Sequence, residues 1–439
     1  MEFPKGFLFG SSVSPYQAEG NITGERKTDW DVYLKKHPEK NLNSSDGIGP
    51  NWWTFPVAES DFERLHDLGL NAQRLGFEWA RIMPEQGKID TSSIKRYRKM
   101  HDCLVSLKMV PVWTLNHFTL PYWVAEFGGW ENPQIVAEFK KYTEIMVYEF
   151  GDVTDWITIN EPNQIVDMGY IFGSWPPGKK FRFDKLPFLL KNLSAAHKNS
   201  YEIIKKNIPN SKIGVANAVK FLKPFNPNSF LDRKVTEIAN YLENNKLIDL
   251  SKDYTDFIGL NYYHSYLLKF NPTLKLTLRD DAEGVVKTAP FLETVKPEGL
   301  ISDAGWPITP ELFHELLLNI YKKYKKPIMI TENGIADQED KLGAFYFLSH
   351  LSSEAKAIQK GVVINGHFCW SSVDTEEWML GYKYKFGLIG LNYVTEEREV
   401  RNRAKLYGEI ATTGKLDVQK LSEKYLTLEQ KRVLGKIYS

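Results

Sequence analysis

Eight short apolar segments, separated by stretches with helical periodicity, most strongly limit the folds open to this chain. Apolar runs of this length indicate strands of a parallel sheet that is covered on both faces. We predict strands at residues 7–12, 71–78, 110–115, 156–161, 212–218, 255–263, 327–332 and 363–371. We predict helices at residues 57–68, 94–107, 134–150, 188–207, 310–324 and 344–360. This α/β alternation has no internal break in composition, so it predicts one closed parallel (β/α)8 barrel over residues 1–439.

The segments between these elements predict extended loops that follow the strands. Residues 162–187 and 265–308 are long connections, and we expect the second to form an inserted hairpin and loop over the functional site. Residues 21–55 are rich in loop-forming residues. Residues 412–439 are lysine-rich with spaced apolar residues, which predicts a C-terminal helical extension. Packing or subunit contact is the favoured role for this extension, and a helix on a membrane surface is the alternative.

Charge and composition argue against several classes of protein. The net charge of +1 gives no basic surface for nucleic acid or for an anionic membrane. No stretch approaches 18 uninterrupted apolar residues, and the first ten residues lack the pattern of a signal peptide. We therefore expect a cytoplasmic protein without a membrane span, and a homo-oligomer remains open. Cys103 and Cys369 lie in apolar segments and are expected to be reduced.

Two of the predicted strands end in a glutamate within a tight motif. Residues 156–162 (WITINEP) run into Glu161 and a proline, and residues 327–334 (PIMITENG) run into Glu332 and a turn. The carboxyl ends of barrel strands are where catalytic groups of this fold sit. Two glutamates from two strand ends therefore predict one site with an acid/base and a nucleophile.

Two carboxyl groups suit glycoside hydrolysis with retention of configuration. One protonated carboxyl donates to the leaving oxygen, and an ionised carboxylate about 5–5.5 Å away attacks the sugar carbon. We assign Glu161 as the acid/base and Glu332 as the nucleophile, and we expect the charge of Glu332 to raise the pKa of Glu161. A structural or surface role for one or both glutamates is the alternative. We expect neither a metal site nor a cofactor, because this chemistry needs none and the histidines lack ligand spacing.

Other polar and aromatic residues at the predicted strand ends fit a sugar site. Arg74 and Tyr263 are expected to orient Glu332 and keep it ionised, although an ion pair at the barrel end would also explain Arg74. Flat apolar sugar faces stack on indole rings, and Trp370 and Trp378 are the candidates. The candidates for bonding sugar hydroxyls are Gln17, His117, Asn160 and Glu377.

Seven motifs, in order along nearly the whole chain, resemble glycoside hydrolase family 1, the β-glucosidase/β-galactosidase family. They lie at residues 3–20, 71–74, 114–117, 158–162, 259–263, 330–334 and 370–378. The double Trp at 52–53 and the segment 78–81 are closer to the archaeal-type branch.

The resemblance implies a TIM barrel and a cofactor-free double displacement on small β-glycosides and oligosaccharides. Glu161 would be the acid/base and Glu332 the nucleophile. The resemblance also adds Asn261 to the nucleophile's supports, and it places Trp306 on the leaving-group side.

Two residues depart from the family pattern. A third, Glu377, fits the pattern and argues against 6-phosphorylated sugars as substrates. Phe118 stands where many members have Trp, and Glu376 stands where an aromatic residue is common. An extra carboxylate at the sugar edge leaves the choice among glucose, galactose, fucose and mannose open. Members acting on 6-phosphorylated sugars have Ser in place of Glu377, whose charge would repel a phosphate.

We therefore expect an exo-acting β-glycosidase with transglycosylation as a side activity. An endo-acting glycanase on the same barrel is the rival enzyme, and a non-catalytic sugar-binding barrel is the rival of another class.

Overall fold

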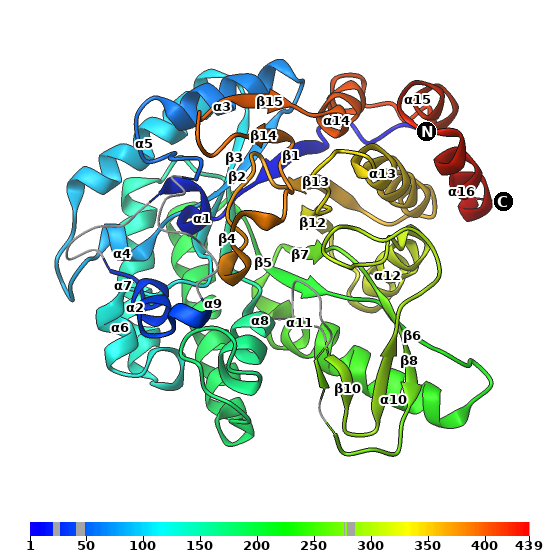
Figure 1. Cartoon of the computed structure of the whole chain (residues 1–439). Helices are drawn as coiled ribbons and strands as arrows, with labels where there is room; N and C mark the ends of the chain where they lie inside the picture. Colours follow the sequence, from blue (N-terminus) through cyan, green and yellow to red (C-terminus); the bar gives the residue numbers. More distant parts are fainter. Residues whose placement is uncertain (21–26, 41–48, 276, 279–285, 439) are drawn as a thin grey trace.

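The computed structural model describes residues 1–20, 27–40, 49–275, 277–278 and 286–438. Eight parallel strands close a barrel in the order β1-β13-β12-β7-β5-β4-β3-β2, which confirms the predicted TIM barrel (Figure 1). The closing seam pairs the first barrel strand with the last, from Leu8 beside Gly366 to Ser12 beside Trp370. The barrel strands are β1 (Leu8–Ser12), β2 (Ala72–Gly76), β3 (Val110–Asn116), β4 (Asp155–Asn160), β5 (Lys212–Val219), β7 (Phe257–Tyr262), β12 (Ile328–Asn333) and β13 (Ile364–Trp370).

Long helices surround the barrel; six of them confirm those predicted by apolar spacing, and α14 was not predicted. They are α3 (Val57–Asp67), α5 (Thr91–Ser106), α7 (Gln134–Glu149), α9 (Leu186–Asn207), α12 (Pro310–Tyr324), α13 (Gly343–Gln359) and α14 (Asn402–Thr413). Between β5 and β7 the chain also forms α10 (Phe230–Asn240) and α11 (Lys246–Ser251), which were not predicted. The buried residues of α10 are Asp232 and Thr236, so this helix turns no apolar stripe toward the core.

Side chains from the barrel strands fill the barrel interior below its carboxyl end. One layer takes one residue from each of seven strands, and aromatic packing continues outside, where Phe77 stacks on Trp113 with ring centroids 4.0 Å apart. This packing makes the lower barrel a solid core rather than a channel. The layer consists of Ala72, Val112, Ile157, Ala216, Phe257, Met329 and Phe368.

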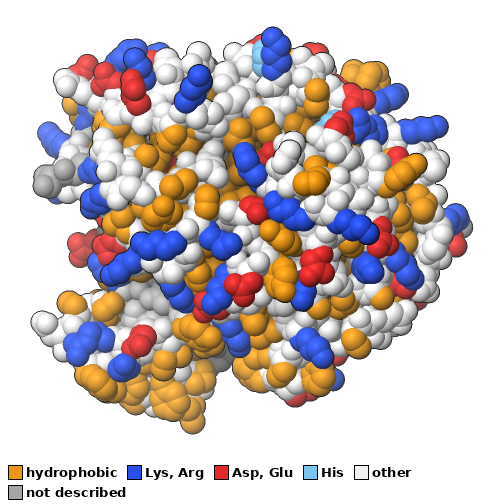
Figure 2. Space-filling view, turned by 180° about the vertical axis from the view of Figure 1, so that it is seen from behind, with side chains coloured by type: hydrophobic (Ala, Val, Ile, Leu, Met, Phe, Trp, Pro, Cys, Tyr) orange, Lys and Arg blue, Asp and Glu red, His pale blue; other side chains and the backbone are white. Residues whose placement is uncertain are grey.

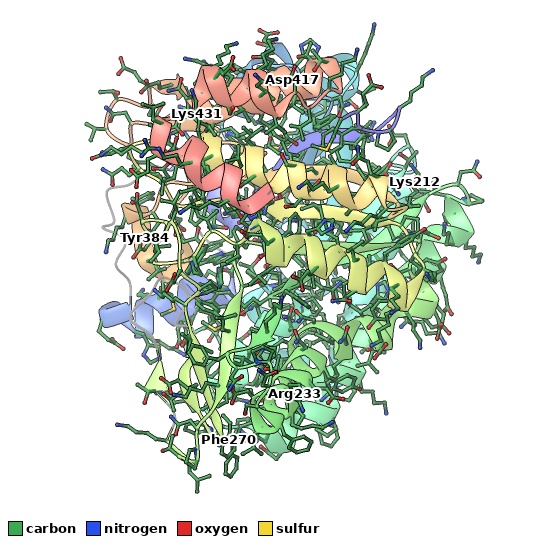
Figure 3. The ribbon with its side chains drawn as sticks, turned by 90° about the vertical axis from the view of Figure 1, so that its right-hand side faces the viewer. Lys212, Arg233, Phe270, Tyr384, Asp417 and Lys431 are labelled. Carbon is green, nitrogen blue, oxygen red and sulfur yellow. The ribbon has the colours of Figure 1, made fainter. Side chains whose placement is uncertain are left out.

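Residues 276 and 279–285 of the predicted insertion at 265–308 lie outside the described part of the chain. The insertion forms a lobe beside the barrel, and its final loop brings Trp306 to the cavity at the carboxyl end of the barrel. Its strands join a five-stranded sheet in the order β6-β8-β11-β10-β9, which packs against α10 (Figures 1 and 3). Figure 3 labels Arg233 and Phe270 in this lobe. The strands are β6 (Leu222–Pro224), β8 (Tyr266–Phe270), β9 (Thr277–Leu278), β10 (Val286–Ala289) and β11 (Leu292–Val295).

Two predicted boundaries near the N-terminus were wrong. The second strand ends at Gly76, and Glu78 instead caps the short helix α4 (Trp79–Ile82), with its side chain accepting from the Ala80 amide. The predicted loop at 21–55 contains the helix α2 (Asp29–Lys36), which starts with a capping box. Residues 21–26 and 41–48 of that range lie outside the described part of the chain.

The C-terminal extension consists of two helices, α15 (Val418–Tyr425) and α16 (Leu428–Tyr438). Both contact α13 and bury leucines at positions 421, 426 and 434, which supports the packing role (Figure 3). Both cysteines are free, as expected. None of the helices in the described residues is long and apolar enough to cross a membrane.

Candidate active site

A cavity of about 240 Å³ lies at the carboxyl ends of the barrel strands. Both predicted catalytic glutamates line it, one following β4 and the other on β12. The pairing of β4 with β5 and that of β12 with β7 shift register just before these residues, and such irregularities turn side chains toward active sites. The lining residues are His117, Phe118, Asn160, Glu161, Met168, Ser174, Trp175, Tyr263, Trp306, Glu332, Trp370, Glu377, Trp378, Met379, Leu380 and Phe386.

Glu332 is a buried carboxylate held by two donors. Arg74 Nη1 donates to its Oε1 at 2.5 Å, and the Tyr263 hydroxyl donates to its Oε2 at 2.7 Å. Burial raises the pKa of Glu332, while the Arg74 charge and the bonds from Tyr263, Arg74 and Asn261 act in the opposite direction. The two donors also fix the carboxylate, as the predicted roles of Arg74 and Tyr263 require.

Arg74 is fully buried on β2 and links both halves of the site. Besides the bond to Glu332, its Nη2 donates to Asn160 Oδ1 at 2.6 Å. The same guanidinium donates to the Thr331 carbonyl at 3.1 Å and to the hydroxyls of Ser12 and Thr114 at 3.3 Å. A rigid fork with this many acceptors favours a positioning role over a simple ion pair.

Glu161 reaches the cavity through an unusual backbone conformation. Its φ is +43°, and it precedes the short helix α8 (Pro162–Val166), which begins with the predicted proline. Asn261 Nδ2 donates to Glu161 Oε1 at 2.8 Å and to Asn160 Oδ1 at 3.1 Å. The left-handed conformation of a non-glycine residue costs energy, and such strain concentrates at functional sites.

His117 is held as a neutral imidazole. Asn160 Oδ1 accepts from Arg74 and Asn261, so its Nδ2 must donate to His117 Nε2, 3.1 Å away. Burial and the Arg74 charge keep the pKa of His117 well below its usual range. The proton therefore lies on Nδ1, which is buried and has no hydrogen-bond partner among the described residues. This nitrogen is a donor available to a ligand.

Aromatic rings form the walls of the cavity. The Trp370 ring lies 5.9 Å from His117, and Phe118 packs on Trp378 with centroids 5.0 Å apart. Trp306 lies edge-on to Tyr263 at 5.6 Å. These rings give the cavity apolar walls beside the two carboxyl groups, and the stacking of a sugar on Trp370 or Trp378 stays a prediction.

Gln17 and Glu376 lie differently from the expectation, because neither lines the cavity. Gln17 Oε1 accepts from Ser14 Oγ at 2.7 Å, and its Nε2 donates to the Glu376 carbonyl at 2.5 Å. The Glu376 carboxyl is bonded by Tyr382, and burial raises its pKa to about 7. Gln17 thus holds the segment that carries Glu377, and Glu376 adds no carboxylate to the cavity wall.

Several lining residues were not predicted. Met168, Ser174 and Trp175 come from the loop between β4 and α9, and Phe386 comes from the segment after β13. The position of Trp175 in a Gly/Pro loop after a catalytic strand was the available signal. Within the described residues, no group of three or more His, Cys, Asp or Glu could hold a metal ion.

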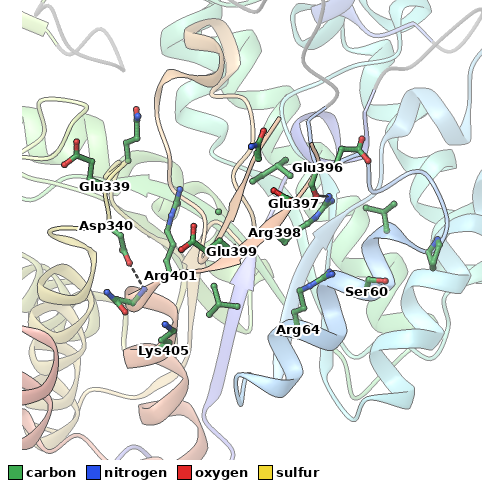
Figure 4. A pocket seen from close by; sticks show the side chains of 18 residues that line it. Ser60, Arg64, Glu339, Asp340, Glu396, Glu397, Arg398, Glu399, Arg401 and Lys405 are labelled. Atoms are coloured by element: carbon green, nitrogen blue, oxygen red, sulfur yellow. Dashed lines mark hydrogen bonds between the residues drawn. The ribbon is translucent and has the colours of Figure 1, made fainter. Parts of the chain in front are cut away.

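A larger hollow, of about 1100 Å³, lies away from the two glutamates and is lined mainly by charged residues (Figure 4). Its arginines are engaged within the protein: Arg401 donates to both oxygens of Asp374, Arg64 donates to Asp61, and Arg398 donates to the Pro50 carbonyl. Two of its charged residues, Arg398 and Arg401, lie on or next to β15 (Arg398–Val400), which pairs with β14 (Ile389–Leu391). Neither catalytic candidate lines this hollow, so we place the active site in the smaller cavity.

The family model for glycosyl hydrolase family 1 matches residues 1–249 and 231–416. The chain belongs to this family. It is 30% identical to β-glucosidase A of Thermotoga maritima, over 95% of this chain and 99% of that protein. It is 28% identical to a β-galactosidase of Pyrococcus woesei, over 97% and 99%. The structure of a β-glycosidase from Pyrococcus horikoshii superposes with a TM-score of 0.85 at 30% identity, over 98% of this chain and 99% of that one.

The predicted family was therefore correct. This family 1 protein is a glycoside hydrolase of the β-glucosidase/β-galactosidase type.

Proposed function

We propose that this family 1 hydrolase is a retaining, exo-acting β-glycosidase that releases a terminal β-linked glucose, galactose or similar hexose. The observation that carries the proposal is the placement of Glu161 and Glu332 on one cavity with different partners. Glu332 faces a guanidinium and a phenol, whereas Glu161 accepts from the neutral amide of Asn261. A nearby cation favours the ionised form of Glu332, and the charge of Glu332 favours the protonated form of Glu161.

The reaction takes two displacements at the anomeric carbon. A Glu332 oxygen bonds to that carbon as the glycosidic bond breaks, and Glu161 gives its proton to the departing oxygen. Glu161 is then a carboxylate, and loss of the Glu332 charge in the covalent intermediate lets it stay ionised. Glu161 then takes a proton from water, the water oxygen bonds to the anomeric carbon, and Glu332 leaves as a carboxylate. An alcohol in place of water gives transglycosylation.

Five other residues that line the cavity bind the sugar. His117 Nδ1 donates to a hydroxyl, and Asn160 keeps one amide hydrogen for another hydroxyl. Glu377 accepts from hydroxyls and repels a phosphate, which disfavours 6-phosphorylated substrates. Trp370 and Trp378 stack on the apolar face of the ring. These contacts hold the anomeric carbon between the two carboxyl groups.

The size of the cavity favours end-wise cleavage over attack within a polymer. At about 240 Å³ it lies below the roughly 300–1,000 Å³ of sites for drug-sized ligands, so it suits one sugar ring. Trp175 and Trp306 narrow it from two separate loops. An endo-acting enzyme instead needs an open groove that accepts chain on both sides of the cleaved bond.

Azide rescue tests the two roles separately. With an activated nitrophenyl β-glucoside, Glu332→Ala should lose activity by orders of magnitude, and azide should restore turnover with the α-glucosyl azide as product. Glu161→Ala should form the intermediate and give the β-glucosyl azide, because azide then replaces water in the second step. Glu339→Ala, at an exposed position outside the cavity, is the control.

Two results would contradict these assignments. One is full activity in Glu332→Ala, and the other is an α-configured first product from the wild type. A panel of nitrophenyl β-glycosides identifies the preferred sugar.

A further inference from the structure

A second, largely apolar groove of about 750 Å³ lies beside the catalytic cavity. One wall is the segment that follows α8, with Ile171, Phe172 and Phe183. The opposite wall comes from the lobe, with Leu268, and from the helical turn Tyr241–Asn245 that follows α10, with Leu242. The groove therefore separates the barrel loop that carries part of the catalytic cavity from the inserted sheet.

Met168 lines both the groove and the catalytic cavity, so the two hollows adjoin at this side chain. Asn163 also lines the groove, and it lies on α8, the short helix whose N-cap residue is Glu161. Glu161 is the group that protonates the departing oxygen in the proposed reaction. The leaving group therefore departs on the side of the molecule where the groove begins.

The groove leaves large apolar side chains in water. Phe181, Phe183 and Leu242 line it and are each more than half exposed, and Leu274 is 70% exposed. Hydrophobic side chains also gather over the projecting lobe at the lower left of Figure 2. Exposed apolar surface of this extent usually marks a binding site.

The charged residues of the groove provide little net charge for selecting an ion. Asp167 and Glu243 are opposed by Lys220 and Lys246, and all four line it. Burial raises the pKa of Asp167 to about 8, so its carboxyl is largely protonated at neutral pH and the set carries about one net positive charge. A single net charge gives little selection for a phosphate or a cation, so the apolar walls determine what binds.

We propose that this groove binds the leaving group, and that the natural substrates are β-glycosides of long-chain alkyl or isoprenoid alcohols. This inference rests on the proposed function, because it assigns the far end of the same substrate. The sugar occupies the catalytic cavity, and the hydrocarbon chain passes Met168 and lies between the walls. Each methylene that enters the groove leaves water, which stabilises the transition state for cleavage.

The test compares alkyl β-glucosides from methyl to octyl, at concentrations below those at which they aggregate. We expect kcat/KM to rise about two- to fourfold per methylene once the chain passes Met168. Leu242→Lys places a charge on the groove wall, and Ile238→Lys is the matched control. Both residues are exposed, at 53% and 59%, but Ile238 lies on α10 and does not line the groove.

Leu242→Lys should lower the octyl-to-methyl ratio of kcat/KM at least tenfold. Ile238→Lys should keep the wild-type ratio. The inference is overturned if wild type shows no dependence on chain length, or if Leu242→Lys leaves the ratio unchanged. An equal loss of this ratio in both variants would instead indicate that the alkyl chain binds to exposed apolar surface in general and not to the groove. Absence of hydrolysis of every glycoside would overturn the proposed function itself, and the inference with it.

Discussion

The hydrogen bond from Tyr263 to Glu332 predicts a measurable shift in the pH dependence of hydrolysis. The hydroxyl lies 2.7 Å from Glu332 Oε2 and stabilises the ionised carboxylate. A hydrogen bond to a charged group contributes about 1.5–3 kcal/mol, and one pKa unit corresponds to about 1.4 kcal/mol. Tyr263→Phe should therefore raise the pKa of Glu332 by about 1–2 units. The reaction needs ionised Glu332, so activity should be lost at a higher pH as the medium is acidified.

The assay is the pH profile of kcat/KM with a nitrophenyl β-glucoside, whose acid limb reports the free enzyme. Tyr262→Phe is the matched control, because this neighbouring buried tyrosine donates to or accepts from Ser265 and Thr309 instead. It should lower stability and leave the acid limb in place. An unchanged acid limb in Tyr263→Phe, or an equal shift in both variants, would refute the reasoning.

Three substitutions outside the catalytic pair have expected outcomes of their own. Arg403→Leu removes a fully buried guanidinium that donates to Asp340 at 2.6 Å, so urea denaturation should show an unfolding free energy lower by about 3–5 kcal/mol. Gly334→Ala would place a methyl carbon 2.0 Å from the Trp370 carbonyl oxygen. The Trp370 backbone would have to shift, and displacement of the Trp370 ring with it should lower kcat/KM at least tenfold in nitrophenyl glycoside assays. Gly435→Ala meets open space within α16, so thermal denaturation should show stabilisation of about 1 kcal/mol.

The sequence was most informative where local pattern and tertiary environment agree. Strands β4 and β12 are apolar runs buried on both faces, and each ends where a proline or a turn must follow, so Glu161 and Glu332 could be placed at the barrel mouth. Arg74 and Tyr263 followed from the same logic, because they occupy neighbouring strand ends.

The errors arose where the deciding contact is distant in sequence. Gln17 was expected in the cavity, but its amide is engaged by the Glu376 carbonyl, 359 residues away. Helix α10 was missed because its apolar residues, such as Phe230 and Ile238, face solvent rather than a core. Met168 carries no chemical signal in the sequence, and only the packing of the loop places it between two cavities.

The seam between β1 and β13 has a consequence for biosynthesis. These partners lie more than 350 residues apart, and the Met1 ammonium also donates to the carbonyl of Leu416, which lies between α14 and α15. During translation, one edge of β1 stays unpaired until β13 has been synthesised, when almost the whole polypeptide has left the ribosome. A nascent chain of this protein therefore spends most of its synthesis time with an edge exposed to aggregation, and truncation before residue 364 would leave that edge permanently open.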